Sequence, residues 1–462
     1  MSHHQSIYQT TTSSPDHNPN PKPTTVRRSL QSTSILARNH YLQNANRHRH
    51  RRNRYASHPQ PTNHSNHSLP IGILGREIIA HLSKDPSYQT IHALSRSKKS
   101  TYPPHVHHAS IDLLASPESL ASQLSSQDVS GDYLFFTAYL QEGDEKDLER
   151  INGDMLENFL KALSISGAEK KVKRVVLVTG AKHYGVHLGP VKNPMEETDP
   201  WVEGEGRPPN FYYRQQRILK GMSEGKGWDW VVTYPNDVIG VAKGNFMNLV
   251  TAIGLYAAIT KELDAPFIFP GSRIFYPKTD CFTYSRHHAR FCAWAATEPA
   301  CSNQAFNVVN GDTQTWQTMW PCLAERFGVT IPADQFQAED EKVVPLIERP
   351  PLEDYAETSG LKGKVEKGEV RMRIDLEKWT EREDVKAAWE RLAQREGLEK
   401  DAFEKATWFF LNFVLGRNYD LVISMNKAWK LGFRDWADTW DALEECLDEL
   451  EDEKVLPRTG KK

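Results

Sequence analysis

The chain has 462 residues, of which 39% are hydrophobic and 25% are charged, so it can bury one or more sizeable cores. The formal net charge of −3 gives no excess of either sign, and we therefore expect no nucleic-acid partner. The five cysteines form no CxxC pair and no metal-ligand spacing, which predicts free thiols in a reducing compartment, a cytoplasmic location and no metal site.

The first 69 residues differ in composition from the rest of the chain. They are rich in His, Arg, Ser and Thr, contain one acidic residue, Asp16, and show no hydrophobic period. Such a segment cannot bury a core, so we interpret residues 1–69 as a disordered or mispredicted N-terminal extension. The run from His48 to Arg54 leaves a nucleic-acid or metal patch open, and the acid-poor, basic composition leaves a transit peptide open.

Short apolar runs alternate with helical patterns from residue 71 to residue 240. The patterns predict helices at 71–83 and 145–163, and strands at 90–96, 105–112, 132–139, 173–180 and 228–240. This alternation is typical of a parallel sheet that is covered on both faces. The sequence therefore predicts an α/β fold with a Rossmann-like doubly wound parallel sheet over residues 71–240.

The remaining residues, 241–462, predict a mostly helical part that folds onto this core. Helices are expected at 245–263 and 285–296, and the last third of the chain is rich in Trp and in acid–base pairs. The longest apolar run, Phe246 to Thr260, has roughly 15 residues, whereas a bilayer span needs roughly 20. We therefore expect a buried core helix and no membrane partner.

Two glycines open the first predicted helix, in the sequence Gly72-Ile73-Leu74-Gly75. Glycines at a helix start allow backbone N–H groups to approach a pyrophosphate at the positive end of the helix. A complete fingerprint also needs a strand and an earlier glycine, but the residues before Gly72 read NHSNHSLP. Either the first strand is lost or unrelated sequence replaces it, and we favour the replacement.

Arg96 ends the second predicted strand, where dinucleotide folds select their cofactor. An acidic residue there accepts the ribose hydroxyls, whereas an arginine accommodates a 2′-phosphate. No acid occurs in 95–100, so the position favours NADPH, with an ordinary basic surface turn as the alternative. Further cofactor contacts are expected after the next two strands, from Asp112 and Leu113 beside the adenine and from Thr137 and Ala138 at the middle of the cofactor.

The stretch Val175 to Pro190 ends a buried strand in Thr179-Gly180-Ala181-Lys182-His183-Tyr184. Short-chain reductases usually place a catalytic Tyr-x-x-x-Lys pair on one helix. In the sequence NFYY, however, Tyr212 is followed four residues later by Gln216, and Tyr213 by Arg217, which cannot take over the proton chemistry of a lysine. Lys182 is the available replacement, and a solvated loop lysine is the alternative.

The motifs TGAKHYGVHLGP, NFYY, TYPNDVIG, NFMNLVTAIGLYAAI, FPGS and QAFNVVNGD together resemble those of the progesterone 5β-reductase/iridoid synthase-like (PRISE) family of extended short-chain reductases, in its fungal form. The resemblance runs from about Ile71 to Pro457. It implies an extended Rossmann reductase with NADPH as cofactor and Lys182 as catalytic lysine. The catalytic tyrosine then lies in the NFYY pair, and we prefer Tyr212 over Tyr213. The chain departs from the family pattern at Gln216-Arg217, where an acidic pair is usual, and at its incomplete glycine-rich start.

The leading hypothesis is an NADPH-dependent reductase of the C=C bond of α,β-unsaturated carbonyl compounds, with a small-molecule enone as substrate. The tyrosine hydroxyl, with Lys182 near it, would stabilise negative charge on the carbonyl oxygen. Residues 71–240 would then bind NADP and residues 241–462 the substrate, and a homodimer is left open. The predicted cofactor-binding residues are Gly72, Ile73, Gly75, Arg96, Asp112, Leu113, Thr137, Ala138, Thr179, Gly180, Pro235 and Val238.

Two other readings remain open: a carbonyl reductase or epimerase-like extended short-chain dehydrogenase, and a non-catalytic NADP(H)-binding sensor or scaffold. The absence of Tyr-x-x-x-Lys argues against an epimerase, and the incomplete glycine loop favours the non-catalytic reading. A flat apolar pocket is predicted from five aromatic residues, with ordinary core packing as the alternative for each: Tyr184, Phe211, Phe246, Tyr256 and Phe275.

Overall fold

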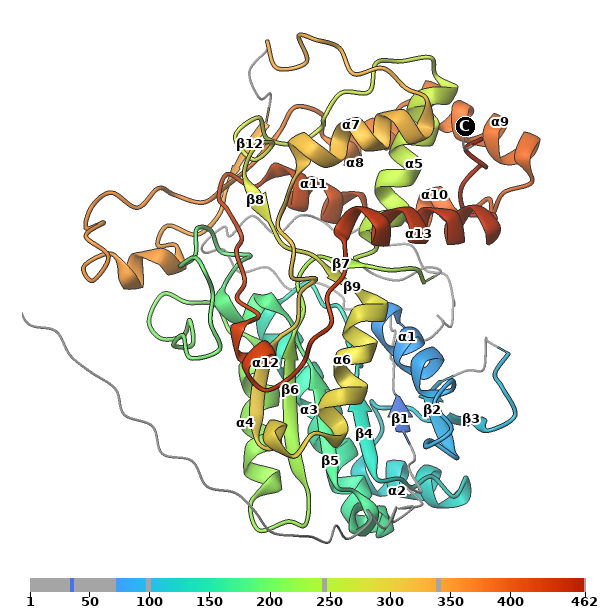
Figure 1. Ribbon diagram of the computed structural model, residues 1–462, viewed down its shortest axis with the longest axis vertical. Helices are drawn as coiled ribbons and strands as arrows, with labels where there is room; N and C mark the ends of the chain where they lie inside the picture. The colour runs from blue at the N-terminus through green and yellow to red at the C-terminus, as the bar shows by residue number, and fades with distance from the viewer. Residues whose placement is uncertain (1–33, 37–71, 97–100, 243–246, 338–341, 461–462) are drawn as a thin grey trace, which may run out of the picture.

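The computed structural model describes residues 34–36, 72–96, 101–242, 247–337 and 342–460, and it has a sheet-containing lobe and a helical lobe (Figure 1). The first lobe is built on a seven-stranded sheet with the order β3-β2-β1-β4-β5-β6-β10, in which every pairing is parallel. Its strands are β1 Ser34–Leu36, β2 Ile91–Ser95, β3 Val106–Ser110, β4 Tyr133–Phe136, β5 Arg174–Val178, β6 Asp229–Tyr234 and β10 Gln304–Asn307. The strand order reverses between β1 and β4, as in a Rossmann fold, which confirms the predicted fold class.

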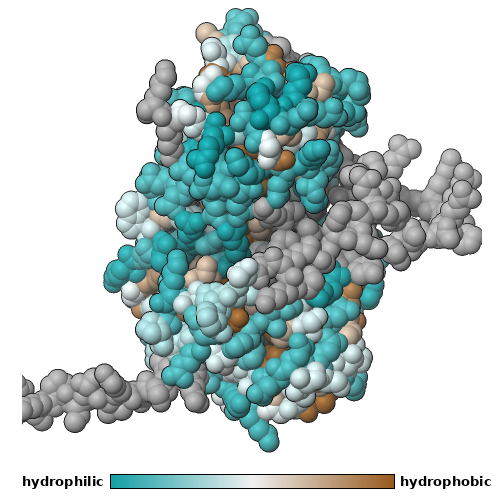
Figure 2. Space-filling model, turned by 90° about the vertical axis from the view of Figure 1, so that its right-hand side faces the viewer, coloured by the Kyte–Doolittle hydropathy of each residue, from teal (hydrophilic) through white to brown (hydrophobic). Residues whose placement is uncertain are grey.

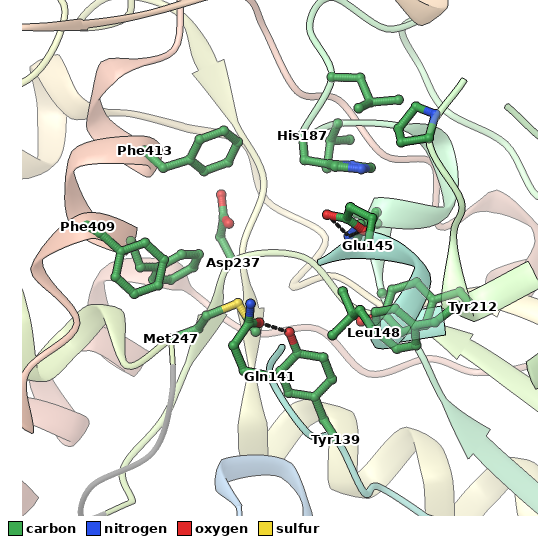
Figure 3. Close-up of a pocket in the computed structure, with 18 of the residues that line it drawn as sticks. Tyr139, Gln141, Glu145, Leu148, His187, Tyr212, Asp237, Met247, Phe409 and Phe413 are labelled. Atoms are coloured by element: carbon green, nitrogen blue, oxygen red, sulfur yellow. Dashed lines mark hydrogen bonds and ion pairs between the residues drawn. The ribbon is translucent and has the colours of Figure 1, made fainter. Parts of the chain in front are cut away.

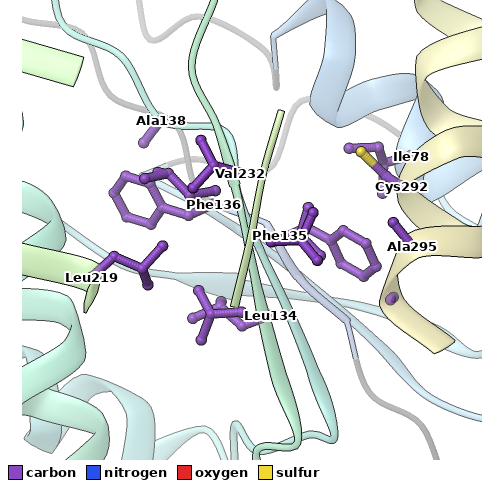
Figure 4. Packing of buried hydrophobic residues seen from close by; sticks show 14 of the residues in the cluster. Ile78, Leu134, Phe135, Phe136, Ala138, Leu219, Val232, Cys292 and Ala295 are labelled. Atoms are coloured by element: carbon purple, nitrogen blue, oxygen red, sulfur yellow. The ribbon is translucent and has the colours of Figure 1, made fainter. Parts of the chain in front are cut away.

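Helices cover both faces of this sheet, because successive strand residues point to opposite faces and most are apolar. In β4, Phe136 faces Leu219 of α4, whereas Phe135 faces Ile78 of α1 and Ala295 of α6 (Figure 4). The helices of this lobe are α1 Ile73–Leu82, α2 Pro117–Ser126, α3 Glu145–Ser166, α4 Phe211–Ser223 and α6 Ser285–Thr297. The predicted helices and strands of residues 71–240 are thus present, with strands a few residues shorter than expected.

One predicted strand, 228–240, is divided into two. β6 ends at Tyr234, and a second short strand, β7 Val238–Ile239, pairs with β9 Thr283–Tyr284. Pro235 follows β6 and has no N–H group to continue the ladder, and Asp237 has a φ of 28°. The chain therefore turns at the carboxyl end of β6, and residues 235–238 form this turn.

The N-terminal region contributes one strand, so of the two alternatives stated above, loss of the first strand or its replacement by unrelated sequence, the first is wrong. Ile35 of β1 is in register with His92 of β2 and with Leu134 of β4. Without β1, the backbone N–H and C=O groups on the facing edges of β2 and β4 would have no ladder partner, and pairing with any extended segment satisfies them. The other residues of the predicted extension, and the run from His48 to Arg54, lie outside the described residues.

The helical lobe has its own hydrophobic core around α5 Leu249–Glu262, in which every residue from Leu249 to Thr260 is buried. The predicted core helix is therefore present, and among the described helices none is both long and apolar enough to cross a membrane. The other helices of this lobe are α7 Trp316–Phe327, α8 Leu376–Glu381, α9 Glu383–Glu396, α10 Ala402–Lys405, α11 Trp408–Gly416 and α13 Thr439–Asp452.

The chain does not divide cleanly at residue 240, where we placed the boundary between the two parts. α6 and β10 return to the sheet lobe, and α12 Asn426–Lys430 packs beside β10. Because β10 runs parallel to β6, the chain between them must cross back to the same end of the sheet, which explains why α6 and β10 belong to the sheet lobe. Two small antiparallel sheets complete the fold, β8 Thr279–Asp280 with β11 Gln314–Thr315 and β12 Lys342–Pro345 with β13 Glu369–Met372. The face in Figure 2 is mostly hydrophilic, with hydrophobic residues scattered over it.

Candidate active site

A cavity of about 1590 Å³ lies where the carboxyl ends of the sheet strands meet the helical lobe. Its floor is formed by residues that follow β4, β5 and β6 and by the start of α1, and its roof by α11, β12 and β13. This position, at the reversal of the strand order, is where doubly wound sheets bind their ligands. Nine of the twelve predicted cofactor-binding residues line it: Gly72, Ile73, Gly75, Thr137, Ala138, Thr179, Gly180, Pro235 and Val238.

The sheet side of the cavity fits a dinucleotide. Gly72 caps the N-terminus of α1 in an extended conformation, with φ −62° and ψ 169°, so the free N–H groups of the first turn face the cavity. At Gly180 a Cβ atom would lie 3.1 Å from Tyr212 Oη and 3.3 Å from the carbonyl oxygen of Pro235. Glycine at this position therefore allows close approach of the tyrosine to the strand end.

Three predicted cofactor residues lie outside this cavity. Arg96 directly follows β2, and its carbonyl oxygen accepts a hydrogen bond from Ser110 Oγ at 3.0 Å. The backbone N–H of Leu114 donates to the Asp112 carboxylate at 3.2 Å, and Leu113 is buried in the sheet core. Both segments follow β2 and β3, on the side of the sheet where the adenine end of the cofactor is expected. Their contacts with the cofactor remain predictions.

Of the Lys182-His183-Tyr184 triplet, Lys182 alone lines the cavity. His183 and Tyr184 turn inward through a short 3₁₀ helix, Ala181–Tyr184. The His183 ring stacks on Tyr234 with centroids 4.1 Å apart, and burial lowers its pKa to about 3, so the ring is neutral. Tyr184 Oη donates to Asn307 Oδ1 at 2.6 Å. The triplet thus combines one residue that faces the cavity with two that anchor the strand end in the core.

The two tyrosines of the NFYY sequence have different environments. Tyr212 lines the cavity, and burial raises the pKa of its phenol, so that the group is a neutral hydrogen-bond donor. The Tyr213 side chain is 2% exposed and stacks on Trp201. Its hydroxyl donates to the carbonyl oxygen of His183 and accepts from the backbone N–H of Val202 at 2.8 Å. Tyr213 is therefore placed as a packing residue, and Tyr212 as the one that can reach a ligand.

Asn210 connects the tyrosine helix to the lysine. Its side-chain oxygen caps α4 by accepting the backbone N–H of Tyr212 at 3.1 Å. Its amide nitrogen donates to the carbonyl oxygen of Lys182 at 2.9 Å. One asparagine side chain therefore fixes the start of α4 relative to the 3₁₀ turn that carries the lysine.

An ion pair that the sequence did not reveal holds Lys182. Its Nζ lies 3.0 Å and 3.2 Å from the two carboxylate oxygens of Glu145, the first residue of α3 (Figure 3). The Lys182 side chain is 21% exposed, and its Nζ is 5.7 Å from the ring centroid of Phe211. Glu145 comes directly after the helix cap Asp144, and nothing in the local pattern separates it from an ordinary acidic first turn.

The departure from the family pattern at Gln216-Arg217 has a structural explanation. Gln216 is fully buried; its Oε1 accepts from Tyr234 Oη at 2.8 Å, and its amide nitrogen is 3.3 Å from His183 Nδ1. Arg217 is exposed and pairs with Glu203 at the surface. Neither residue lines the cavity, so this position supports the strand end from behind.

The wall opposite the tyrosine is aromatic and comes from α11, which sequence reasoning did not single out. Phe409, Phe410 and Phe413 line the cavity together with Met247 (Figure 3). Of the five aromatic residues predicted to wall the pocket, Phe211 lines the cavity, and Phe246 lies outside the described residues. The other three are packed in the two hydrophobic cores, as the alternative interpretation held: Tyr184, Tyr256 and Phe275.

Arg417 closes the site where α11 ends. It is 1% exposed and pairs with both carboxylate oxygens of Asp237, at 2.6 Å and 3.0 Å. Asp280 lies 3.5 Å from the same guanidinium group, and burial raises its pKa well above the usual range. These contacts tie α11 to the turn after β6, so the aromatic wall is fixed relative to the strand ends.

The described side chains contain no cluster of His, Cys, Asp or Glu that could hold a metal ion. A parallel sheet with this strand order, a glycine-started helix at its switch point, and a tyrosine on α4 and a lysine after β5 that line one cavity define an oxidoreductase of the short-chain dehydrogenase/reductase type. Residues 106–347, more than half of the chain, match the model of the PRISE-like Rossmann-fold domain. The chain therefore belongs to the PRISE-like Rossmann-fold family, as its motifs predict.

Relatives extend over most of the chain. An uncharacterized protein of Schizosaccharomyces pombe is 42% identical over 84% of this chain and 96% of its own length. An (S)-8-oxocitronellyl enol synthase of Camptotheca acuminata is 31% identical over 70% of this chain and 75% of its own. A 3-oxo-Delta(4,5)-steroid 5-beta-reductase of Arabidopsis thaliana is 28% identical over 70% and 74%. The last two names, together with the family match, confirm an enzyme and support a reductase.

Among solved structures, an epimerase from Methanothermobacter thermautotrophicus has a TM-score of 0.53 and 13% identity, over 92% of this chain and 94% of its own. At this identity the likeness concerns the fold alone, and it confirms the extended Rossmann architecture.

Proposed function

We propose that the protein is an NADPH-dependent reductase that reduces the C=C bond of α,β-unsaturated carbonyl compounds. The observation that carries the proposal is the placement of Tyr212: a neutral phenol faces the cavity beside the ends of β5 and β6, and Lys182 lines the same cavity. The steroid 5-beta-reductase relative supports the reaction class, because its name describes reduction of a ring C=C bond in a 3-oxo-Delta(4,5) steroid.

The cofactor half of the site has residues suited to each part of NADPH. The first turn of α1, from Gly72 to Gly75, would hold the pyrophosphate, and Arg96 would hold the 2′-phosphate. Thr179 and Gly180 would lie against the nicotinamide end. The chemistry that NADPH supplies when bound is hydride donation to an electron-poor carbon.

The chain's own residues act on the carbonyl oxygen of the substrate. Tyr212 Oη donates a hydrogen bond to this oxygen and stabilises the negative charge that develops there during 1,4-addition. The raised pKa of Tyr212 suits this role, because a neutral phenol donates and a phenolate does not. Lys182 adds positive charge near the same oxygen, and Glu145 holds its ammonium group in place. The phenylalanines of α11 exclude water and hold a flat apolar substrate.

The proposal is tested with the purified protein, NADPH and 2-cyclohexenone, with the products separated by gas chromatography. We expect cyclohexanone, in which the carbonyl group is kept, and a kcat that is lower by about 10²–10³-fold in Tyr212→Phe. Formation of 2-cyclohexenol instead would favour a carbonyl reductase. Tight NADPH binding without turnover of cyclic or open-chain enones would favour a non-catalytic NADP(H)-binding protein.

A further inference from the structure

Arg76, which directly follows Gly75, joins the start of α1 to two other segments. Its Nη1 donates to the carbonyl oxygen of Val241, just after β7, at 3.2 Å. Its Nη2 pairs with Glu449 and lies 3.3 Å from Glu453 Oε1, at the C-terminal end of α13. Arg76 therefore connects the helix whose first turn lines the cofactor half of the cavity to the helical lobe.

The chain has no tight turn that could fix the start of α1. In dinucleotide-binding folds, a short glycine-rich turn joins the first strand to the first helix and places the helix start at the sheet edge. Here residues 37–71 separate β1 from Gly72, the cap of α1. A connection of this length does not set the distance between strand end and helix start, because the reach of a segment grows with its length. Contacts of the helix itself must therefore position its first turn.

The first turn and the rest of α1 are held by different contacts. Ile78 and Leu82 belong to the hydrophobic core of the sheet lobe. Ile73, in the first turn, lies instead against the chain that follows β7: a Cβ atom added at Gly240 would be 2.3 Å from Ile73 Cγ2. The next residue after Gly240 is Val241, whose carbonyl oxygen accepts from Arg76. Close packing and a hydrogen bond thus fix the first turn at one place, the end of β7.

Glu449 makes this connection rigid because it binds two guanidinium groups. Its Oε1 pairs with Arg76, and its Oε2 lies 2.7 Å from Arg286 Nη2 of α6. Arg286 also reaches Glu77 of α1 at 3.4 Å and Glu445 of α13 at 2.8 Å. Figure 1 shows α13 above α1 and α6. Single exposed ion pairs add little to stability, but planar guanidinium groups that share one carboxylate restrict the relative position of the three helices.

The position of the first turn matters for one part of the cofactor. The N–H groups of this turn, from Gly72 to Gly75, face the cavity. The attraction of a helix N-terminus for an anion falls off within the first turn, so it depends on where that turn lies relative to the phosphates. A shift of the turn would weaken ligands that carry a pyrophosphate. Ligands that carry the adenine end alone, which is expected beside β2 and β3, would keep their contacts.

We propose that Arg76 is a positioning residue for the cofactor: by bridging α1 to α13 and to the chain after β7, it holds the first turn of α1 where the pyrophosphate binds, in place of the missing tight turn. The inference rests on the proposed function, because it assumes that a dinucleotide lies at the start of α1. It adds that the helical lobe takes part in binding the cofactor.

The test is calorimetric titration with NADP⁺, which requires no turnover, together with 2′-AMP, which has the adenine and the 2′-phosphate but no pyrophosphate. We expect Arg76→Gln to weaken NADP⁺ binding by about 3–20-fold, the range of one helix-terminus interaction with an anion, and to leave 2′-AMP binding unchanged. Glu449→Gln should cause a similar selective loss, and the double variant should lose less than the product of the two. Arg76→Lys keeps the charge but cannot span both partners, so it should restore only part of the affinity.

Arg326→Gln is the matched control on α13. Arg326 of α7 pairs with Asp448 and Glu451 of α13, at 2.8 Å and 2.6 Å, and these pairs do not involve α1. This variant should lower the melting temperature and leave NADP⁺ binding unchanged. An equal loss of NADP⁺ affinity in Arg326→Gln, an equal loss of both ligands in Arg76→Gln, or wild-type affinity in either Arg76 variant would overturn the inference. If Arg76→Gln does not fold, Arg76→Lys and Glu449→Gln supply the same comparison.

The binding data also separate this inference from the reductase assignment. A wild type that binds NADP⁺ in this Arg76-dependent way but reduces no enone would refute the reductase proposal and leave the positioning role standing. A wild type that reduces enones, with NADP⁺ affinity unchanged in Arg76→Gln, would refute the positioning role and leave the reductase standing. A wild type that does not bind NADP⁺ would overturn both.

Discussion

Tyr212 and Tyr213 offer a test in which each variant is the control of the other. Tyr212→Phe removes a hydroxyl that faces the cavity and leaves the ring in place. Losing one positioned donor at a developing oxyanion costs on the order of 10²–10³ in kcat. We expect a loss of this size in Tyr212→Phe. The melting temperature should be unchanged, because burial is the one cause of the raised pKa of this phenol and no hydrogen bond contributes to it.

Tyr213→Phe should have the opposite effects. Its hydroxyl bridges the His183 carbonyl and the Val202 N–H in a position that is 2% exposed. Removing it leaves both backbone groups unpaired, at a cost of about 1–3 kcal/mol in the free energy of unfolding. Activity at a temperature well below melting should stay within a few-fold of wild type.

The assays are single-turnover NADPH oxidation with a reactive enone and urea unfolding of the same preparations. Single turnover isolates the chemical step from product release. A fully active Tyr212→Phe together with an inactive but stable Tyr213→Phe would refute the assignment of Tyr212 as the proton donor. A loss of stability in Tyr212→Phe equal to that in Tyr213→Phe would refute the structural contrast between them.

Four further outcomes are expected. Glu145→Gln should lower kcat by about tenfold and leave KM for NADPH nearly unchanged, because the Lys182 ammonium loses its carboxylate partner; an unchanged kcat would show that the ion pair does not position the lysine. Arg96→Ala should raise KM for NADPH by about 10–100-fold and leave NADH kinetics unchanged, which steady-state assays with both cofactors can check. Ile35→Pro should lower the midpoint of urea unfolding, since β1 is a central strand, whereas Ile35→Val, which keeps the N–H donor and a β-branched apolar side chain, should have a smaller effect. The free energy of unfolding should fall as the pH drops from about 6.5 towards 3, because the unfolded chain takes up a proton on His183 that the folded chain, with a pKa of about 3, does not; His183→Phe should flatten this slope.

The parts of the fold that follow from local pattern were predictable. Buried strands such as Tyr133–Phe136 are continuous apolar runs, and α3 begins at a capping aspartate and ends at Gly167 in the left-handed region, φ 79°. Alternation of such strands with helices leaves few topologies besides a parallel sheet. The gathering of nine predicted cofactor-binding residues around one cavity followed from the same logic, because the carboxyl ends of parallel strands meet at one edge.

The parts that could not be predicted depend on contacts between distant segments. Glu145 meets Lys182 across 37 residues, and Asp237 meets Arg417 across 180. Neither carboxylate differs in its local sequence from a solvated one. The position of β1 was hidden for another reason: a three-residue strand carries too little pattern to be recognised, and its pairing depends on backbone groups that every sequence has.

The proposed role of Lys182 as partner of Tyr212 offers a reason why the NFYY sequence begins with asparagine. In the usual Tyr-x-x-x-Lys arrangement, one helical turn fixes the distance between the two side chains. Here the tyrosine starts α4 and the lysine lies on a separate 3₁₀ turn, so some other contact must fix their relative position. Asn210 supplies it by capping α4 at the Tyr212 N–H and by donating to the Lys182 carbonyl. A serine or aspartate would cap the helix equally well but has no amide N–H₂ to donate. The identity of this residue is therefore explained by its contact with the Lys182 carbonyl as much as by the helix cap.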